Sequence, residues 1–187
     1  MQELKEKEEV ELNEICNISA GGDKPQIVSN VKTENSVPIY SNGTIDEGLY
    51  GYTNKAKIND KAVTVSARGT IGFTCLRLEP FYPIVRLISL VPKDSRVCAE
   101  FLYLSILEMN IISTGTTQQQ LTVPSFKQEK ITVPKNDEDI EKFKKLIEPI
   151  YMKIKANKEQ NEKLSQIRDT LLPKLMNGEI DLDKVEI

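Results

Sequence analysis

The stretch of sequence that decides the fold lies near the C-terminal end, where residues 137–180 read DEDIEKFKKLIEPIYMKIKANKEQNEKLSQIRDTLLPKLMNGEI. Apolar and amide side chains recur there in steps of three and four: Ile140, Phe143, Ile147, Ile150, Ile154, Asn157, Asn161, Leu164, Ile167 and Leu171. A stripe this narrow is typical of a coiled-coil seam and is narrower than the face a helix packs on a globular core. The segment therefore predicts a long helix that needs a partner.

Polar and imino residues mark the expected ends and interruptions of this helix. Asp137 is placed to cap its N-terminus, and Asn177-Gly178 is a plausible C-cap. Pro149 lacks an amide and its ring clashes one turn back, so we expect a kink or a restart there, and a second interruption at Pro173. From Pro149 to Leu172 the helix would be roughly 36 Å long.

The preceding part of the chain, residues 1–136, predicts a mixed α+β domain. Apolar, β-branched runs indicate strands at Val37–Tyr40, Ala62–Ser66, Ile71–Leu78, Ile84–Val91 and Ile131–Val133. Residues 100–110 have the spacing and length of a helix. We expect a twisted mixed or antiparallel sheet with flanking helices, followed by residues 137–187 as a long coiled-coil-type helix with a C-terminal tail.

Composition excludes several kinds of active site. The chain has 187 residues, a net charge of −3 and no histidine. The Ser-His-Asp and Cys-His nucleophile systems and the His-containing zinc sites are therefore ruled out. Gly43 and Gly48 have the glycine spacing of a phosphate loop, but Leu49 stands where its lysine should be. With this net charge, any contact with DNA must come from local clustering of basic groups.

The cysteines and the apolar runs indicate the cellular setting. Cys16, Cys75 and Cys98 are widely scattered, and an odd count without a secretory signal favours reduced thiols in a cytoplasmic protein. No apolar run approaches the ~20 residues that a membrane span needs. We expect a cytoplasmic protein without a membrane contact and without a metal or cofactor of its own.

Two loops of the first domain carry side chains suited to DNA. Ser66-Ala67-Arg68-Gly69-Thr70-Ile71-Gly72 joins two apolar runs, and its arginine presents a fork of donors that fits a guanine edge or a phosphate. In the second loop, Thr116-Thr117-Gln118-Gln119-Gln120, glutamine can pair with adenine and threonine with phosphate. The alternatives are an ordinary hairpin turn with a solvated arginine, and a polar loop that leads into a helix cap.

Basic side chains elsewhere in the domain would add positive potential. Lys55 and Lys57 are included with the DNA-binding candidates, and Arg77 and Arg86 are further sources of positive charge. The faces on which these four side chains lie cannot be placed from the sequence.

In the order of its motifs, the chain resembles half of the DNA-specificity subunit of a type I restriction–modification system. The resemblance covers roughly residues 10 to 182, and its most specific piece is Leu164–Ile180. The other matching segments, in order, are Val10–Ile15, Gly21-Gly22, Val37–Tyr40, Val65–Gly72, Gly115–Gln118 and Ile131–Pro134.

The resemblance implies a target-recognition domain that reads one half of a bipartite site in double-stranded DNA. It also implies a spacer helix that docks the methyltransferase and restriction subunits. In this family, S-adenosylmethionine, ATP and Mg belong to those partner subunits, so this chain is expected to be non-catalytic. The family normally carries the unit twice in one chain. Because it occurs once here, we expect a homodimer or pairing with another half-subunit through the helix.

Pairing about a two-fold axis would bury the isoleucine stripe against itself, as an isologous interface requires. Asn157 and Asn161 would favour one register of the two helices. The pair would hold two recognition domains apart by about one turn of DNA, ~34 Å. A helix that folds back on its own domain is the alternative structure.

Two other functions stay open at this point. One is an interaction protein that replaces a spacer of a full-length specificity subunit and does not read DNA. The other is a recognition fragment of a fused methyltransferase or nuclease.

Overall fold

A computed structural model describes residues 6–34, 36–109, 111 and 120–179. The chain divides into two compact units, residues 1–144 and 145–187. The division falls inside the long C-terminal helix, so the first turns of that helix belong to the first unit.

A four-stranded antiparallel sheet forms the centre of the first unit. Its strands lie in the order β2 (Cys16–Ala20), β8 (Leu87–Pro92), β5 (Ala62–Ser66) and β6 (Thr74–Arg77). Every residue of β5 is buried, as expected for a central strand whose two faces are both covered.

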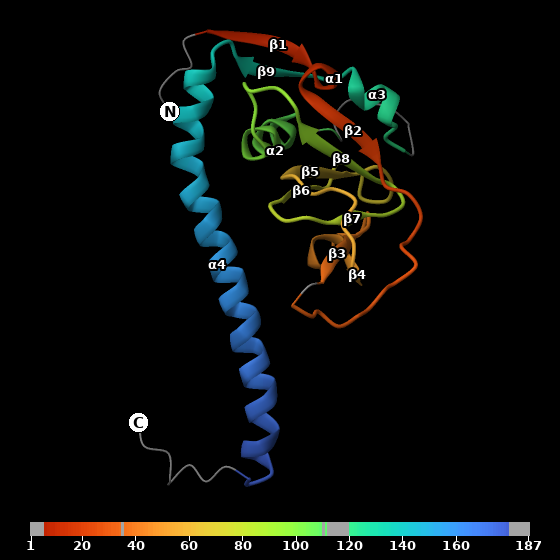
Figure 1. The fold of residues 1–187 in the computed structure, drawn as a ribbon, viewed down its shortest axis with the longest axis vertical. Helices are drawn as coiled ribbons and strands as arrows, with labels where there is room; N and C mark the ends of the chain where they lie inside the picture. Colours follow the sequence, from red (N-terminus) through yellow and green to blue (C-terminus); the bar gives the residue numbers. More distant parts are fainter. Residues whose placement is uncertain (1–5, 35, 110, 112–119, 180–187) are drawn as a thin grey trace. The chain divides into compact units, whose positions relative to one another are not determined.

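Two smaller sheets complete the unit (Figure 1). In the first, β3 (Val37–Tyr40) pairs antiparallel with β4 (Leu49–Thr53) and parallel with the short β7 (Tyr82–Pro83). In the second, β1 (Lys7–Glu11) pairs antiparallel with β9 (Lys130–Pro134). This last pair joins the two sequence ends of the domain.

Short helices cover the sheet and supply much of the core. They are α1 (Leu12–Ile15), α2 (Ala99–Glu108) and α3 (Val123–Lys127); a short turn with left-handed residues, η1 (Ile45–Gly48), lies between β3 and β4. Helix α2 packs against β5, β6 and β8. The core side chains that these elements bury together include Leu12, Ile15, Val63, Leu90, Leu102, Ile106 and Phe126.

The expected α+β class, with antiparallel sheets and a long C-terminal helix, is confirmed. Strands β3 and β5 have the predicted bounds. Strand β6 begins at Thr74, later than predicted, because the preceding residues form a tight turn with Gly69 and Gly72 at positive φ. Strand β8 likewise begins at Leu87, directly after Arg86 at φ 66°.

Helix α4 (Asp137–Met176) runs through both of its prolines. We expected a kink or a restart at Pro149; the restart is wrong, and so is the interruption expected at Pro173. A proline removes one hydrogen bond, to the carbonyl four residues earlier. Intact turns flank Pro149 on both sides, and Pro173 lies within the last turn, so the helix stays continuous.

The N-terminal cap of α4 also differs from the prediction. Asn136 is the cap, because its Oδ1 accepts from the amide of Asp139 at 3.1 Å. Asp137 accepts a hydrogen bond from the hydroxyl of Ser95 at 3.0 Å instead. The predicted capping role of Asp137 is therefore wrong by one residue.

The C-terminal end of α4 confirms the predicted Asn177-Gly178 cap. Gly178 has a φ of 71°, the left-handed conformation that glycine adopts readily. The amide of Gly178 donates to the carbonyl of Leu175 at 3.2 Å, and that of Glu179 to the carbonyl of Lys174 at 2.9 Å. These two bonds make a Schellman motif, which ends the helix.

Candidate nucleic-acid interface

The turn that joins β5 to β6 presents Arg68 to solvent. The Ser66 amide donates to the Phe73 carbonyl at 2.9 Å, and the Gly72 amide returns to the Ser66 carbonyl at 3.0 Å. Ala67 is buried, whereas Arg68, Gly69 and Thr70 are exposed. The segment is therefore a hairpin turn, as the alternative interpretation predicted. The same turn exposes the Arg68 side chain to solvent.

The second candidate loop meets the first at this turn. Nη2 of Arg68 donates to Oε1 of Gln120 at 2.7 Å, although the two residues are 52 positions apart. The amide of Leu121 donates to the carbonyl of Ala67 at 2.8 Å, which fixes the approach of the two segments. The other candidates of that loop, Thr116–Gln119, lie outside the described residues.

A third segment, the loop after β3, is hydrogen-bonded to the turn. Nδ2 of Asn42 donates to the carbonyl of Arg68 at 2.9 Å, and the Ser66 hydroxyl donates to the carbonyl of Asn42 at 3.1 Å. Ser66 is fully buried. Its hydroxyl therefore holds the loops together inside the protein, and its predicted contact with DNA is wrong.

Asn42 was not identified from the sequence. The dipeptide Asn42-Gly43 is a turn signal and predicts a bend after β3. Nothing in that local signal tells which distant loop the bend touches.

The backbone of Arg86 contacts the same turn at Ala67. Its carbonyl accepts from the amide of Ala67 at 2.9 Å, and its side chain is exposed. Asn42, Arg68, Arg86 and Gln120 thus come from four segments that meet around Ala67, and we call them the Arg68 surface. The paired guanidinium of Arg68 and amide of Gln120 suit the edges of guanine and adenine and the phosphates between them.

Arg77 has a different role from the one that its charge suggested. The residue is 4% exposed; its Nε donates to Oγ1 of Thr64 at 3.0 Å and its Nη2 to the carbonyl of Glu47 at 2.6 Å. The guanidinium lies 3.5 Å from the ring centroid of Tyr40. It therefore joins the two larger sheets and offers no positive potential to DNA. Burial raises the pKa of Tyr40, and the nearby Arg77 charge opposes that rise.

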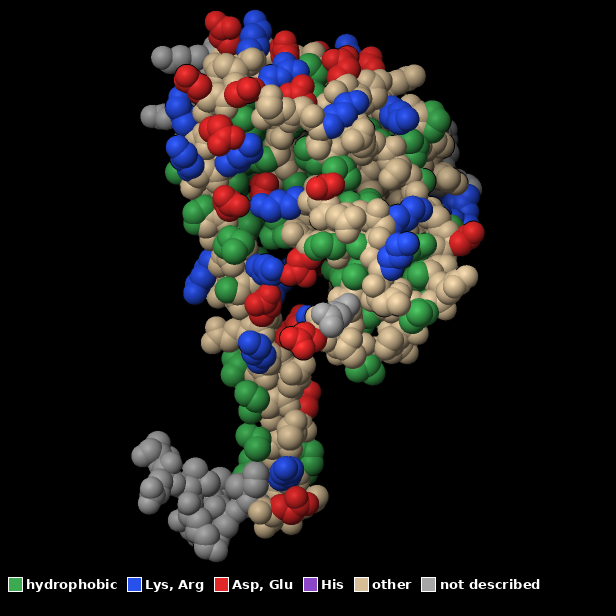
Figure 2. Space-filling model, in the orientation of Figure 1, with side chains coloured by type: hydrophobic (Ala, Val, Ile, Leu, Met, Phe, Trp, Pro, Cys, Tyr) green, Lys and Arg blue, Asp and Glu red, His purple; other side chains and the backbone are tan. Residues whose placement is uncertain are grey.

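The two lysine candidates, Lys55 and Lys57, lie in the segment between β4 and β5. Both side chains are exposed, and Nζ of Lys57 lies 6.0 Å from the ring centroid of Tyr82. Within the described ranges, no hydrogen bond or ion pair joins Lys55 or Lys57 to the Arg68 surface. Figure 2 shows basic and acidic side chains interspersed over the face in view, so charge alone marks no interface there.

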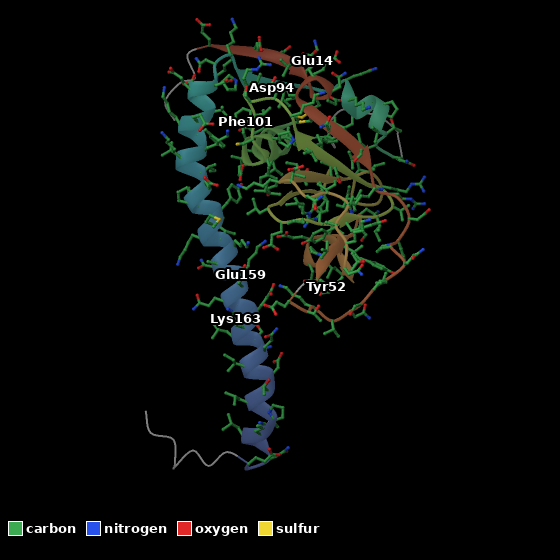
Figure 3. The ribbon with its side chains drawn as sticks, viewed as in Figure 1. Glu14, Tyr52, Asp94, Phe101, Glu159 and Lys163 are labelled. Atoms are coloured by element: carbon green, nitrogen blue, oxygen red, sulfur yellow. The ribbon has the colours of Figure 1, made fainter. Side chains whose placement is uncertain are left out.

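The apolar stripe of α4 is divided between the two units. Ile140 is 1% exposed, and the ring of Phe143 meets that of Phe101 edge to face at 5.6 Å. Phe101, on α2, is labelled in Figure 3. Ile140 is already covered by its own domain and is not available to a second helix, so its predicted place in a dimer seam is wrong.

Beyond residue 144 the stripe is open to solvent in the single chain. Ile147 is half-buried, and the other predicted seam residues are exposed: Ile150, Ile154, Asn157, Asn161, Leu164, Ile167 and Leu171. No helix among the described residues is long and apolar enough to cross a membrane.

The sequence matches a family model described as the type I restriction modification DNA specificity domain, over residues 4–166. The chain belongs to this family. This type I specificity chain is 34% identical over 136 residues to the type I restriction enzyme HindI specificity subunit of Haemophilus influenzae. The match covers 69% of the chain and 29% of that subunit.

Solved structures of the family share its fold. The type I restriction-modification S subunit from M. genitalium matches with a TM-score of 0.69 and 20% identity, over 91% of this specificity chain and 46% of that one. The HsdS subunit from Thermoanaerobacter tengcongensis matches with a TM-score of 0.53 and 21% identity, over 93% and 46%. The specificity chain thus spans less than half the length of these relatives.

Proposed function

We propose that the chain is one sequence-reading half of a type I specificity subunit and that it binds double-stranded DNA through the Arg68 surface. The observation that carries the proposal is the direct contact of Arg68 with Gln120. Two loops that each carry side chains suited to DNA thus meet at one exposed place.

The geometry of this pair suits base recognition. The bond to Gln120 uses one donor of the Arg68 guanidinium and leaves the rest of the fork for a guanine edge. The bond uses one lone pair of the Gln120 amide oxygen, and the NH₂ group of the same side chain can donate to a base. The support from Asn42 behind the turn restricts the loop before DNA arrives, which lowers the entropy cost of binding.

The exposed part of α4 supports a proposal for assembly. A second copy, or another half-subunit, would cover its apolar side chains from Ile150 to Leu171 and supply the second recognition domain. In this arrangement the chain is non-catalytic and works in the cytoplasm. Methyltransferase and restriction subunits dock on the paired helices and carry S-adenosylmethionine, ATP and Mg.

Selection from a random pool of DNA tests the proposal, with the chain and its modification subunit present together. A homodimer should select an inverted repeat whose halves are separated by a nonspecific spacer. Recovery of single, asymmetric half-sites alone would refute the homodimer. Failure to enrich any sequence would refute DNA reading and support the interaction protein that only replaces a spacer.

A further inference from the structure

The loop between β3 and β4 exposes the side chain of an isoleucine to solvent. Ile45 is 82% exposed, and among the described residues no large apolar side chain is more exposed. An isolated exposed apolar residue is common on protein surfaces. This one is unusual because the backbone around it is fixed in an uncommon conformation.

Three consecutive residues after Ile45 have a left-handed backbone. Their φ angles are 48° at Asp46, 55° at Glu47 and 84° at Gly48. Residues other than glycine adopt such angles rarely, and the conformation persists only where its surroundings impose it. At Gly48 a Cβ would lie 2.5 Å from the carbonyl oxygen of Ser41, so glycine is required there.

Buried contacts impose this conformation. Nη2 of Arg77 donates to the carbonyl of Glu47 at 2.6 Å, and its Nη1 lies 3.5 Å from the Glu47 carboxylate. The Ser41 amide also donates to the Gly48 carbonyl at 2.8 Å, which closes the base of the loop. Arg77 is therefore a positioning residue for the loop that carries Ile45.

The same loop is continuous with the Arg68 surface. Asn42, three residues before Ile45, donates to the carbonyl of Arg68 and accepts from Ser66. The loop and the Arg68 turn therefore cannot move independently. The tip of the loop is thus only three residues from a direct contact with the Arg68 turn, within the span of a ligand as large as a DNA duplex.

The charges near Ile45 indicate which part of DNA would meet it. Asp46 is exposed and its carboxylate would repel phosphates, whereas Arg77 already pairs with the Glu47 carboxylate. An exposed apolar side chain beside a carboxylate is unsuited to a phosphate, whereas it suits the C5-methyl group of thymine in the major groove. We infer that Ile45 is a specificity-determining residue that contacts a thymine methyl group; this inference rests on the DNA-binding function proposed above.

Replacing thymine with deoxyuridine tests the contact, because it removes the methyl group and leaves every hydrogen bond of the base pair. The DNA is the site recovered by selection, and binding is measured for the full chain with its modification subunit. At one thymine, the replacement should weaken wild-type binding about fourfold, which is what burial of one methyl-sized group contributes. Ile45→Ala should weaken binding to the thymine site at least as much and should be insensitive to deoxyuridine there.

Two variants make the result specific. Ile45→Val should keep most of the sensitivity to deoxyuridine, and Val31→Ala, which removes another side chain exposed at 67%, should behave as wild type. An Ile45→Ala variant that keeps the wild-type response at every thymine overturns the inference. If Arg68→Ala loses specificity while Ile45→Ala changes nothing, the proposed function stands and the role of Ile45 falls. If wild type enriches no sequence, both fall.

Discussion

Replacing Arg77 with methionine should destabilise the first unit, because its guanidinium joins the two larger sheets. The group makes hydrogen bonds of 3.0 Å to Thr64 and 2.6 Å to Glu47, and it stacks on Tyr40. Each hydrogen bond from a charged donor contributes about 1.5–3 kcal/mol and the ring contact about 2 kcal/mol. Burying the guanidinium costs several kcal/mol, and that cost is recovered in the variant. The net loss of stability should be about 2–4 kcal/mol.

Urea unfolding, followed by the near-ultraviolet circular dichroism of tyrosine, measures this loss. With a slope of about 2 kcal/mol per molar urea, a loss of 3 kcal/mol lowers the midpoint by about 1.5 M. Arg68→Met is the matched control, because it removes an exposed arginine and should change stability by less than about 0.5 kcal/mol. Equal midpoints for the two variants would refute the reasoning, since the contacts of Arg77 would then only balance its desolvation.

Three further predictions concern the core, the acid stability and the thiols. Ile140→Ala should lower the unfolding free energy by about 2–5 kcal/mol, whereas Ile154→Ala, at an exposed position, should change it by less than about 0.5 kcal/mol in urea titrations of the monomer. Hydrogen bonding to Arg96 lowers the pKa of Asp94 below its usual 3.8, so its carboxylate stabilises the fold above about pH 4 and that stability is lost as the pH falls through the lower folded value. Asp94→Asn should therefore flatten the acid side of a stability–pH curve. Burial raises the pKa of Cys16 to about 12, so iodoacetamide at pH 8 should leave it unmodified in mass spectra of the native chain, and rapid labelling would contradict its burial.

The elements that the sequence predicted are those with strong local signals. Strand β5 has a run of β-branched residues, and α4 has a sustained apolar repeat. Strand β1 reads Lys-Glu-Glu-Val-Glu and carries no such signal. Its pairing with β9 depends on backbone hydrogen bonds across more than a hundred residues, which local patterns do not encode.

The candidate site was predictable in part for the same reason. The capacity of Arg68 and Gln120 to hydrogen-bond to bases follows from their residue types. The structure shows in addition that the two side chains are in contact. Ser66 and Arg77 have equally suitable chemistry but are buried, and only the packing of the sheets determines that. Asn42 and Ile45 were missed because their importance depends on which loops meet around Ala67.

That Arg68 reads a base is tested most directly by the binding of its variants to single-base-pair variants of the selected site. Arg68→Ala should weaken binding to the selected site by about 1–3 kcal/mol and lose discrimination at one base pair while keeping it elsewhere. Arg68→Lys should lose the same discrimination despite its charge, because an ammonium lacks the planar fork. Uniform weakening at every position by Arg68→Ala, restored by Arg68→Lys, would instead assign the residue to a phosphate and contradict the claim.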